Sequence, residues 1–275
     1  MEKLLIGGVA GIVSRTCTAP IELWKMRAQN PYMNEGTMMG MIRNEGITSL
    51  WKGNGLNCIR IFPQSAINVA MFKTLQEWVS HQEIPAIYRP LTNGGCGVIA
   101  GATAISIVYP FETLRSRFAL QTSSNPKYTS LRHALSQTSL GELYQGLGTS
   151  LMGFAPYNGL CFMFYYLHKE HVMTASLFDN IPESYKHLLC GGFAGVGAVS
   201  ITYPTDLVRR RLQLQGFSTD VPDTPRIRDV LRHIWTTEGV TGFYRGLGAC
   251  YAKIFPSLAI QFAVMEQLSS ILLKK

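Results

Sequence analysis

The chain has 275 residues, of which 47% are hydrophobic and only 15% are charged, and its formal net charge is +8. Soluble domains carry about 25% charged residues, so this composition argues against an ordinary soluble domain and indicates several membrane helices with apolar outer and polar inner faces. The positive charge suits an anionic lipid or solute as partner, whereas basic residues scattered without a recognised binding motif argue against nucleic acid.

The first predicted helix spans residues 3–30 and contains the segment PIELWKMR, which begins at Pro20. Gly7 and Gly11 precede this proline at a spacing of four residues, and Arg15 lies between Gly11 and the proline. Small residues at this spacing allow membrane helices to pack closely.

The second predicted helix spans residues 55–80 and contains the segment CIRIFPQSAI, which places Arg60 and Pro63 in an apolar stretch. A charged residue near the centre of a bilayer costs about 2.5–3.5 kcal/mol on insertion scales, so Arg60 is expected to face a polar interior and to serve a function. A proline in a membrane helix kinks it and frees a carbonyl, which is tolerable where that backbone faces a partner or a wet cavity.

The third and fourth predicted helices, residues 88–121 and 147–170, repeat these features. The segment PFETLRSR begins at Pro110, and GFAPYNG in the fourth helix corresponds to the stretch around Arg60, with Gly153 in place of the arginine.

The fifth and sixth predicted helices, residues 184–214 and 247–272, give a third copy. The segment PTDLVRRR begins at Pro204, and AKIFPSLAI again corresponds to the stretch around Arg60, now with Lys253 in place of the arginine.

Three internal repeats therefore make up the chain, and we expect one all-α bundle built from residues 1–85, 86–178 and 179–275. The first prolines of the three repeats, Pro20, Pro110 and Pro204, are separated by 90 and 94 residues. Each of them begins the pattern Pro-x-acid-x-x-base-x-base. A glycine pair precedes each one: Gly7 and Gly11, Gly97 and Gly101, Gly191 and Gly195. The six prolines expected to kink the helices are Pro20, Pro63, Pro110, Pro156, Pro204 and Pro256.

The triple proline motif, with a later aromatic-x-Gly segment in each repeat, resembles the mitochondrial carrier family over nearly the whole chain. The resemblance implies six transmembrane helices in three pseudosymmetric repeats, with short matrix helices, around a central substrate site in the mitochondrial inner membrane. Lys and Arg are concentrated in the loops within the repeats, which are expected to stay on the side from which positive charge is not translocated. The resemblance implies that this side is the matrix and that both termini face the intermembrane space.

A matrix gate is implied by the resemblance, in which acids and bases of the proline motifs pair between neighbouring repeats. The pairs are Glu22–Arg115, Glu112–Arg209 and Asp206–Lys25, with Gln29 and Gln213 as bracing glutamines and Ala119 at the third bracing position.

A cytoplasmic gate is implied at the other end of the bundle. Its positions hold Lys73, Gln76, Tyr166, Lys169, Glu266 and Ser269. Of these, Lys169 and Glu266 keep the character that the family pattern requires, so we expect a weak gate held by hydrogen bonds or apolar contacts.

The substrate site implied by the resemblance lies between the two gates. Arg60, Gly153 and Lys253 each precede a cytoplasmic gate position by thirteen residues, which places them at equal depth, and Arg15 resembles a further cationic contact. Converging cations in a pocket of low dielectric repel one another unless an anion joins them, and arginine suits phosphate oxygens.

An aromatic ring is expected beside these cations, in the flat space that Gly153 leaves between Phe154 and Tyr157. Asn68 and Gln261 could then bind a ribose or a base. A polyanion with an aromatic ring is a nucleotide, so the predicted substrate-binding residues are Arg15, Arg60, Asn68, Gly153, Phe154, Tyr157, Lys253 and Gln261.

The segments SRTCTAP, GFAPYNG and KIFP resemble the nucleotide and nucleotide-cofactor branch of the family. We expect exchange of (deoxy)nucleotides, such as ATP, ADP and dATP, by alternating access. A coenzyme A or thiamine pyrophosphate carrier is the alternative, and a leak or uncoupling-type protein is a further one, supported by the incomplete cytoplasmic gate. The sequence lacks a nucleophile–base constellation, a metal-ligand set and a Walker loop, so we expect no enzymatic activity and no cofactor, with Mg²⁺ present only if the nucleotide carries it.

Lipid contacts are implied at the aromatic-x-Gly segments, which resemble the cardiolipin sites of the family. The residues concerned are Trp51, Lys52, Gly53, Tyr144, Gly146, Tyr244, Arg245 and Gly246. Cardiolipin is therefore the expected structural lipid, and one bundle should suffice, so a monomer is expected.

Overall fold

Six long helices form the bundle in the computed structural model, which describes residues 2–30, 38–82, 85, 88–121, 126–174, 183–215, 217 and 226–272. They are α1 (Glu2–Ala28), α3 (Asn54–Ser80), α4 (Arg89–Leu120), α7 (Leu147–Thr174), α8 (Glu183–Gln213) and α11 (Leu247–Leu272). The predicted all-α arrangement is confirmed, and the predicted spans differ from the observed ones by at most four residues at any end.

Short helices lie between the two long helices of each repeat. They are α2 (Met38–Glu45) and the 3-10 helix η1 (Ile47–Trp51), α5 (Leu131–Gln137) and α6 (Leu140–Leu143), and α9 (Ile227–Thr237) and α10 (Gly239–Gly242). The helices α5 and α6 begin at serine caps, because the Ser130 and Ser139 hydroxyls accept hydrogen bonds from the backbone N–H groups of His133 and Glu142.

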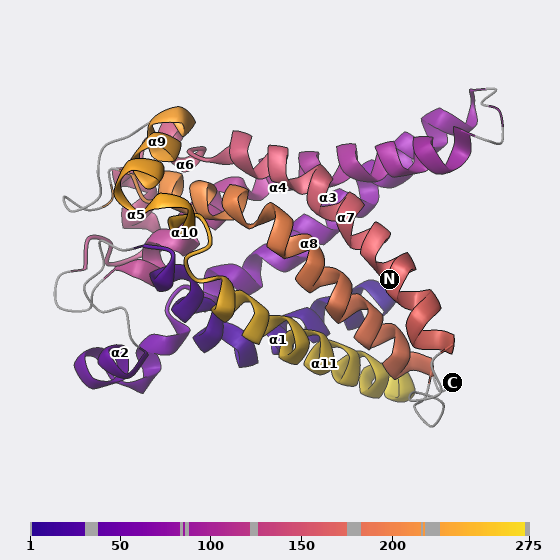
Figure 1. Ribbon diagram of the computed structural model, residues 1–275, viewed down its shortest axis with the longest axis horizontal. Helices are drawn as coiled ribbons and strands as arrows, with labels where there is room; N and C mark the ends of the chain where they lie inside the picture. Colours follow the sequence, from indigo (N-terminus) through magenta and orange to yellow (C-terminus); the bar gives the residue numbers. More distant parts are fainter. Residues whose placement is uncertain are drawn as a thin grey trace.

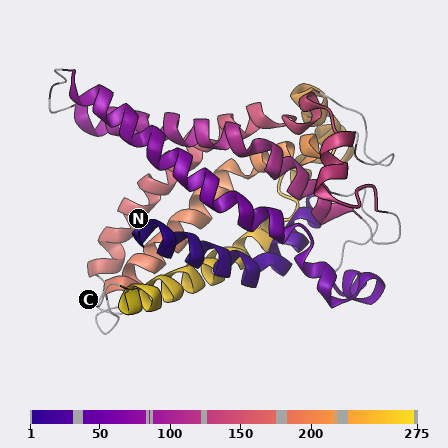
Figure 2. The same cartoon turned by 180° about the vertical axis from the view of Figure 1, so that it is seen from behind.

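The long helices converge toward the end of the bundle that carries α5, α6, α9 and α10, and they spread toward the end that carries both chain ends (Figures 1 and 2). The converging end is called the closed end below. Along the bundle, α3 packs most extensively on α4, α7 on α8, and α11 on α1. The second long helix of each repeat thus packs on the first long helix of the next, and this order closes the ring of three repeats.

The buried apolar core lies at the closed end. One cluster draws side chains from all three repeats, among them Leu23 and Leu50, Leu114 and Tyr128, and Leu214 and Phe217. A second cluster in the third repeat contains Leu207, Ile234 and Cys250. The two clusters therefore join the repeats where the helices converge.

The outer surface of the long helices is apolar. Large exposed apolar side chains include Ile99, Ile107, Met152, Phe162, Ile201 and Phe262. Within the described ranges, three stretches are long and apolar enough by composition to cross a membrane, namely Thr92–Leu120, Tyr185–Gln213 and Gly239–Ile271. Helices with an apolar outer face and satisfied backbone groups suit a bilayer.

The second glycine of each predicted pair supports close packing between the two long helices of its repeat. The Phe154 ring lies where a Cβ on Gly101 would stand, and Ile61 and Ile254 lie in contact distance of Gly11 and Gly195. The first glycines do not all pack in this way, because the described residues place no atom within 4 Å of a Cβ added at Gly7 or Gly191. The glycines next to these do, since Phe62 covers Gly8 and Phe255 covers Gly192.

All six predicted proline positions lie inside long helices, and each helix continues past its proline. Pro20 removes the hydrogen bond that the carbonyl of Thr16 would otherwise accept. The indole N–H of Trp51 donates to that carbonyl at 2.9 Å. This contact ties the end of η1 to α1 and satisfies a backbone group that the proline frees.

Candidate functional site

Three inter-repeat ion pairs lie at the closed end, at the positions that the proline motifs indicate. Lys25 pairs with Asp206 at 2.7 Å, Arg115 pairs with Glu22 at 3.3 Å, and Arg209 pairs with Glu112. These six residues are called the ion-pair ring below. Each pair joins two different repeats, so the ring holds the converging helices together across the axis of the bundle.

The two predicted bracing glutamines make different contacts. The Gln29 amide donates to Asp206 at 3.3 Å and to the Tyr203 hydroxyl at 3.1 Å, so it touches the ring directly. The Gln213 amide donates to the Tyr109 hydroxyl at 3.0 Å, and its oxygen accepts from Ser116. Gln213 reaches the Glu112–Arg209 pair through two neighbours, because its oxygen also accepts from Arg210, which lies 3.6 Å from Glu112, and the Arg209 guanidinium lies over the Tyr109 ring. That Gln213 braces this pair stays a prediction.

A tyrosine accompanies each of these glutamines, and the third interface lacks both residues. Tyr203 and Tyr109 directly precede Pro204 and Pro110, while the equivalent position before Pro20 is Ala19. The position equivalent to the glutamines in the second repeat is Ala119, which packs against the turn at Gly53. The interface between repeats one and two thus has two small residues where the other interfaces have a hydrogen-bonded pair.

Arg210 adds a cation to the ring that the sequence analysis did not assign. Its guanidinium lies 3.6 Å from Glu112 and 4.0 Å from Glu22, and it donates to Ser116 at 2.7 Å. The signal for it was the run of three arginines in PTDLVRRR, since the residue after the expected gate base lies one helical step further around the axis.

The predicted substrate cations are held by carboxylates of the ring. Arg60 pairs with Glu112 at 2.7 Å, and Lys253 pairs with Glu22. Arg15 donates to the Asn57 side chain at 3.2 Å. In this conformation the ring carboxylates are therefore the anions that join Arg60 and Lys253, in the place where an anionic substrate was expected.

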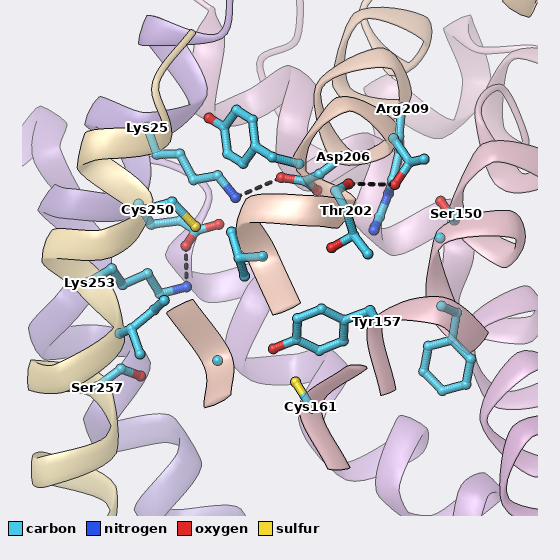
Figure 3. A pocket seen from close by; sticks show the side chains of 18 of the residues that line it. Lys25, Ser150, Tyr157, Cys161, Thr202, Asp206, Arg209, Cys250, Lys253 and Ser257 are labelled. Atoms are coloured by element: carbon cyan, nitrogen blue, oxygen red, sulfur yellow. Dashed lines mark hydrogen bonds and ion pairs between the residues drawn. The ribbon is translucent and has the colours of Figure 1, made fainter. Parts of the chain in front are cut away.

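A cavity of 480 Å³ lies on the side of the ring that faces the wide end of the bundle, between α1, α4, α7, α8 and α11. Figure 3 shows Lys25, Cys250 and Lys253 on one side of it and Tyr157, Thr202 and Arg209 across from them. Of the predicted residues, the cavity is lined by Glu22, Lys25, Gly153, Phe154, Tyr157, Asp206, Arg209 and Lys253. Arg15, Arg60, Asn68 and Gln261 are not part of this lining, which corrects their predicted place around one shared pocket.

The space beside Gly153 is smaller than predicted. A Cβ on Gly153 would stand 2.7 Å from the Thr205 hydroxyl, so the glycine allows α7 to approach α8 and leaves no slot for a ring at that point. Phe154 packs on Gly101 of α4.

An apolar slot lies instead around Tyr157, whose ring projects into the cavity (Figure 3). Its other walls are Gly191, Gly195, Val199, Ile254 and Leu258. Backbone at the two glycines gives α8 a flat surface, which suits a planar ring.

Hydroxyl and thiol groups that the sequence analysis missed line the rest of the cavity: Thr149, Ser150, Thr202, Thr205, Ser257, Cys161 and Cys250. Their signal was the spacing of Thr202 and Thr205 on α8 and of Cys250 and Ser257 on α11, which are three and seven residues apart and so share a helix face. Among the described residues, no group of three His, Cys, Asp or Glu side chains is arranged to hold a metal ion.

The predicted cytoplasmic gate positions are not brought together. Lys73, Tyr166, Lys169 and Glu266 are exposed, and Gln76 and Ser269 are half-buried. No ion pair joins any of these six in the part of the chain that the structure describes. In this conformation the described gate residues at the end opposite the ring are therefore not joined by ion pairs.

The predicted lipid-contact residues make contacts within the chain. Lys52 pairs with Glu45 at 2.6 Å, and Arg245 pairs with Glu238 at 3.2 Å. Tyr144 and Tyr244 stack on Tyr109 and Tyr203. The glycines Gly53, Gly146 and Gly246 have φ of 75°, 84° and 84°, a backbone conformation that requires glycine.

A glutamate anchors the short helices to the preceding long helix in every repeat. Arg27 pairs with Glu45, and Arg211 pairs with Glu238. In the second repeat the position equivalent to Glu45 and Glu238 holds Leu140. Arg117 pairs instead with Glu142, two residues after Leu140, at 3.0 Å. Burial alone would raise the pKa of Glu142 and of Glu238, but hydrogen bonds and charges of the arginines hold both pKa values below the ordinary one.

Comparison with known proteins identifies the family. The model of the family described as "Mitochondrial carrier protein" matches residues 1–83, 88–176 and 182–275. The mitochondrial adenine nucleotide transporter ADNT1 of Arabidopsis thaliana is 32% identical over 98% of this chain and 87% of its own length. The mitochondrial adenyl nucleotide antiporter SLC25A25 of Homo sapiens is 34% identical over 97% of this chain and 58% of its own length.

A third relative, the mitochondrial carrier protein CoAc1 of Arabidopsis thaliana, is 31% identical over 98% of this chain and 89% of its own length. The three family matches cover the three repeats seen in the sequence and the six long helices of the fold. The chain therefore belongs to the mitochondrial carrier family, and it is a multi-pass transporter of the mitochondrial inner membrane and not an enzyme.

Proposed function

We propose that this protein exchanges adenine nucleotides, including di- and triphosphates such as ADP, ATP and dATP, across the mitochondrial inner membrane. The observation that carries the proposal is a cavity lined by three cations and two carboxylates, with an apolar slot beside Tyr157. Phosphates and a planar base are the two parts of a nucleotide that such a cavity would bind. The relatives named as adenine nucleotide transporters support the same substrate class.

The charge balance around the ring favours a polyanion. Three carboxylates (Glu22, Glu112 and Asp206) lie among seven cations (Arg15, Lys25, Arg60, Arg115, Arg209, Arg210 and Lys253), of which Arg15 is held by Asn57 and the other six contact these carboxylates. The excess of four positive charges lies in a region of low dielectric, where unbalanced charges repel strongly. Substrates with three or four negative charges would neutralise most of this excess, and nucleoside di- and triphosphates have such charges.

Substrate binding would also loosen the ring. Arg60 and Lys253 each bind a ring carboxylate, so a phosphate that takes these cations removes partners from Glu112 and Glu22. The helices at the closed end can then separate while the opposite end closes around the substrate. We place the closed end toward the matrix and both chain ends toward the intermembrane space, as the basic loops indicate.

Coenzyme A is the alternative substrate, since it joins an adenine nucleotide to phosphates and a long arm. The identity to CoAc1 is similar to that of the adenine nucleotide relatives, so identity alone does not decide. Thiamine pyrophosphate has a ring and a diphosphate but fewer charges. We further propose that cardiolipin binds the closed end and that one chain forms the transporter.

Exchange in liposomes tests this function. Purified protein is reconstituted with cardiolipin, the vesicles are loaded with buffer, ADP, dATP, coenzyme A, thiamine pyrophosphate or phosphate, and uptake of labelled ATP is measured. We expect uptake into vesicles loaded with ADP or dATP and none into vesicles loaded with buffer. Arg60→Ala should abolish this uptake, whereas Arg132→Ala, on the exposed face of α5, should leave it unchanged.

If ATP entered vesicles loaded with buffer as fast as vesicles loaded with ADP, this result would contradict exchange and favour a leak. Lack of ATP uptake under every load, together with uptake of labelled coenzyme A, would assign the cavity to coenzyme A instead.

A further inference from the structure

The floor of the cavity is formed by facing segments of α7 and α8. A Cβ on Gly153 would meet the Thr205 hydroxyl, and a Cβ on Gly146 would stand 3.1 Å from the Arg209 carbonyl. Thr149 lies between these two glycines in the chain, three residues after Gly146, which directly precedes α7, and one helical turn before Gly153. Because residues three and four apart share a helix face, Thr149 faces the stretch of α8 from Thr205 to Arg209, and it lines the cavity with both of them.

Two hydrogen-bond donors on this floor are buried without a partner. The Thr149 side-chain oxygen has none within the described residues, although Thr149 is only 4% exposed. The Nε–H of Arg209 has none there either, and the ion pair with Glu112 uses the Nη2 group of the same guanidinium. A buried donor without an acceptor costs free energy, so each points to a group that binds there.

The neighbouring hydroxyls are already engaged. Ser150 donates to the Tyr109 hydroxyl at 3.2 Å, and Thr205 donates to the Thr202 carbonyl at 2.7 Å. Asp206, the carboxylate that also lines the floor, is paired with Lys25. Thr149 and Arg209 therefore each supply one donor on this floor that has no partner within the described residues.

We propose that the Thr149 hydroxyl and the Arg209 Nε–H form a subsite for the terminal phosphoryl group of the substrate. The proposal rests on the proposed function and adds a specificity-determining residue to it. An oxyanion matches the subsite because it accepts from both donors and is attracted to the guanidinium, and such charge-assisted hydrogen bonds are strong.

The subsite selects for phosphate chain length. With the base in the slot at Tyr157, a chain of two or three phosphates extends along α7 toward Thr149, whereas a single phosphate stays near the slot. A phosphoryl group at Arg209 also competes with Glu112 for this cation and so loosens the third pair of the ring. Nucleoside di- and triphosphates should therefore open the closed end more readily than monophosphates.

The test is the substitution Thr149→Val, which keeps the shape of the side chain and removes the hydroxyl. Exchange of ATP, ADP and AMP is measured in liposomes with the wild-type protein, Thr149→Val, Thr149→Ser and the control Thr103→Val, whose exposed threonine hydroxyl donates to the Ile99 carbonyl on the outside of α4. Loss of one hydrogen bond to a charged group should raise the KM for ATP and ADP on the order of tenfold. The KM for AMP should not change, Thr149→Ser should restore the wild-type value, and Thr103→Val should have no effect.

A binding measurement separates this subsite from the proposed function. Thermal stabilisation of the purified protein by inorganic tripolyphosphate should be weaker in Thr149→Val than in the wild-type protein or in Thr103→Val. If the wild-type protein exchanges no nucleotide but shows this difference, the proposed function is wrong and the oxyanion subsite stands. If Thr149→Val exchanges all three nucleotides and binds tripolyphosphate as the wild-type protein does, or loses all three nucleotides equally, the subsite is wrong.

Discussion

At the scale of single residues, the closed end shows how charge can be buried at the centre of a bundle. Arg117 is fully buried, and its guanidinium donates to Glu142, to the Tyr128 hydroxyl and to the carbonyls of Gln213 and Gln215. The two carbonyls lie at the end of α8 and just beyond it, so one side chain of the second repeat satisfies backbone groups of the third. Four of the five N–H groups of the guanidinium thus have an acceptor, which offsets most of the cost of removing the charge from water.

Substitution of Arg117 by methionine should therefore destabilise the protein strongly. The change leaves the carbonyls of Gln213 and Gln215 without this donor, and removing one partner of a buried charged pair costs about 3–5 kcal/mol. Thermal unfolding in detergent measures the effect. The control Arg132→Ala removes an exposed arginine and should change stability by less than about 0.5 kcal/mol. Equal unfolding midpoints for the two variants would contradict the role of Arg117.

The depressed pKa of Glu238 predicts a loss of stability in acid. A carboxyl whose pKa is lower in the folded than in the unfolded state adds stability above the unfolded pKa, and this contribution disappears as the pH falls through the folded pKa. Below the ordinary value of 4.5, the pairs of Glu238 with Arg211 and Arg245 should therefore weaken. Unfolding midpoints from pH 6 to pH 3 should fall less steeply in Glu238→Gln than in the wild-type protein. Parallel curves would show that this pair does not contribute.

At the scale of elements, the contact between α4 and α7 depends on a glycine under an aromatic ring. Repeats one and three place Phe62 and Phe255 on Gly8 and Gly192, whereas the second repeat places Phe154 on Gly101, one turn deeper. The aromatic residue has moved by one position along the sequence, and a different glycine receives it. The three repeats thus solve the same packing problem with two different pairs of positions.

Substitution of Gly101 by alanine should separate this packing role from the general effect of glycine on helices. The added Cβ meets the Phe154 ring and should destabilise the protein by about 1–3 kcal/mol, as overpacking does. Gly94 lies in the same helix with no described atom within 4 Å of an added Cβ. Gly94→Ala should therefore be neutral or stabilising by up to about 1 kcal/mol. Unfolding midpoints test the pair, and equal shifts would refute the packing role of Gly101.

At the scale of the whole molecule, the two ends of the bundle differ in how they are held. The closed end has three inter-repeat ion pairs, and the buried core lies beside them. The described gate positions at the opposite end are exposed or half-buried and make no ion pairs with one another. An exchanger that works by alternating access must close this second end with weaker contacts, so the two conformations should differ in stability.

Restoring charge pairs at the cytoplasmic gate positions, opposite the ion-pair ring, should slow exchange. The substitutions Lys73→Asp, Gln76→Lys, Tyr166→Asp and Ser269→Lys complete an acid and a base on each of α3, α7 and α11. The stronger gate should stabilise the conformation that is open to the matrix and lower the rate of ATP exchange in liposomes. An unchanged rate and an unchanged preference between the two conformations would contradict the inference that the natural gate is weak.

The sequence by itself determined the three repeats, the six long helices and the residue types at the ion-pair ring, because helix periodicity and threefold repetition are local signals. It did not reveal that Arg60 and Lys253 bind Glu112 and Glu22, or that Trp51 caps the carbonyl freed by Pro20. It also did not show which acid pairs with Arg117 in the second repeat; the structure shows that Glu142 does so. These contacts depend on the depth and rotation of helices from different parts of the chain, and only the tertiary structure decides where such side chains meet.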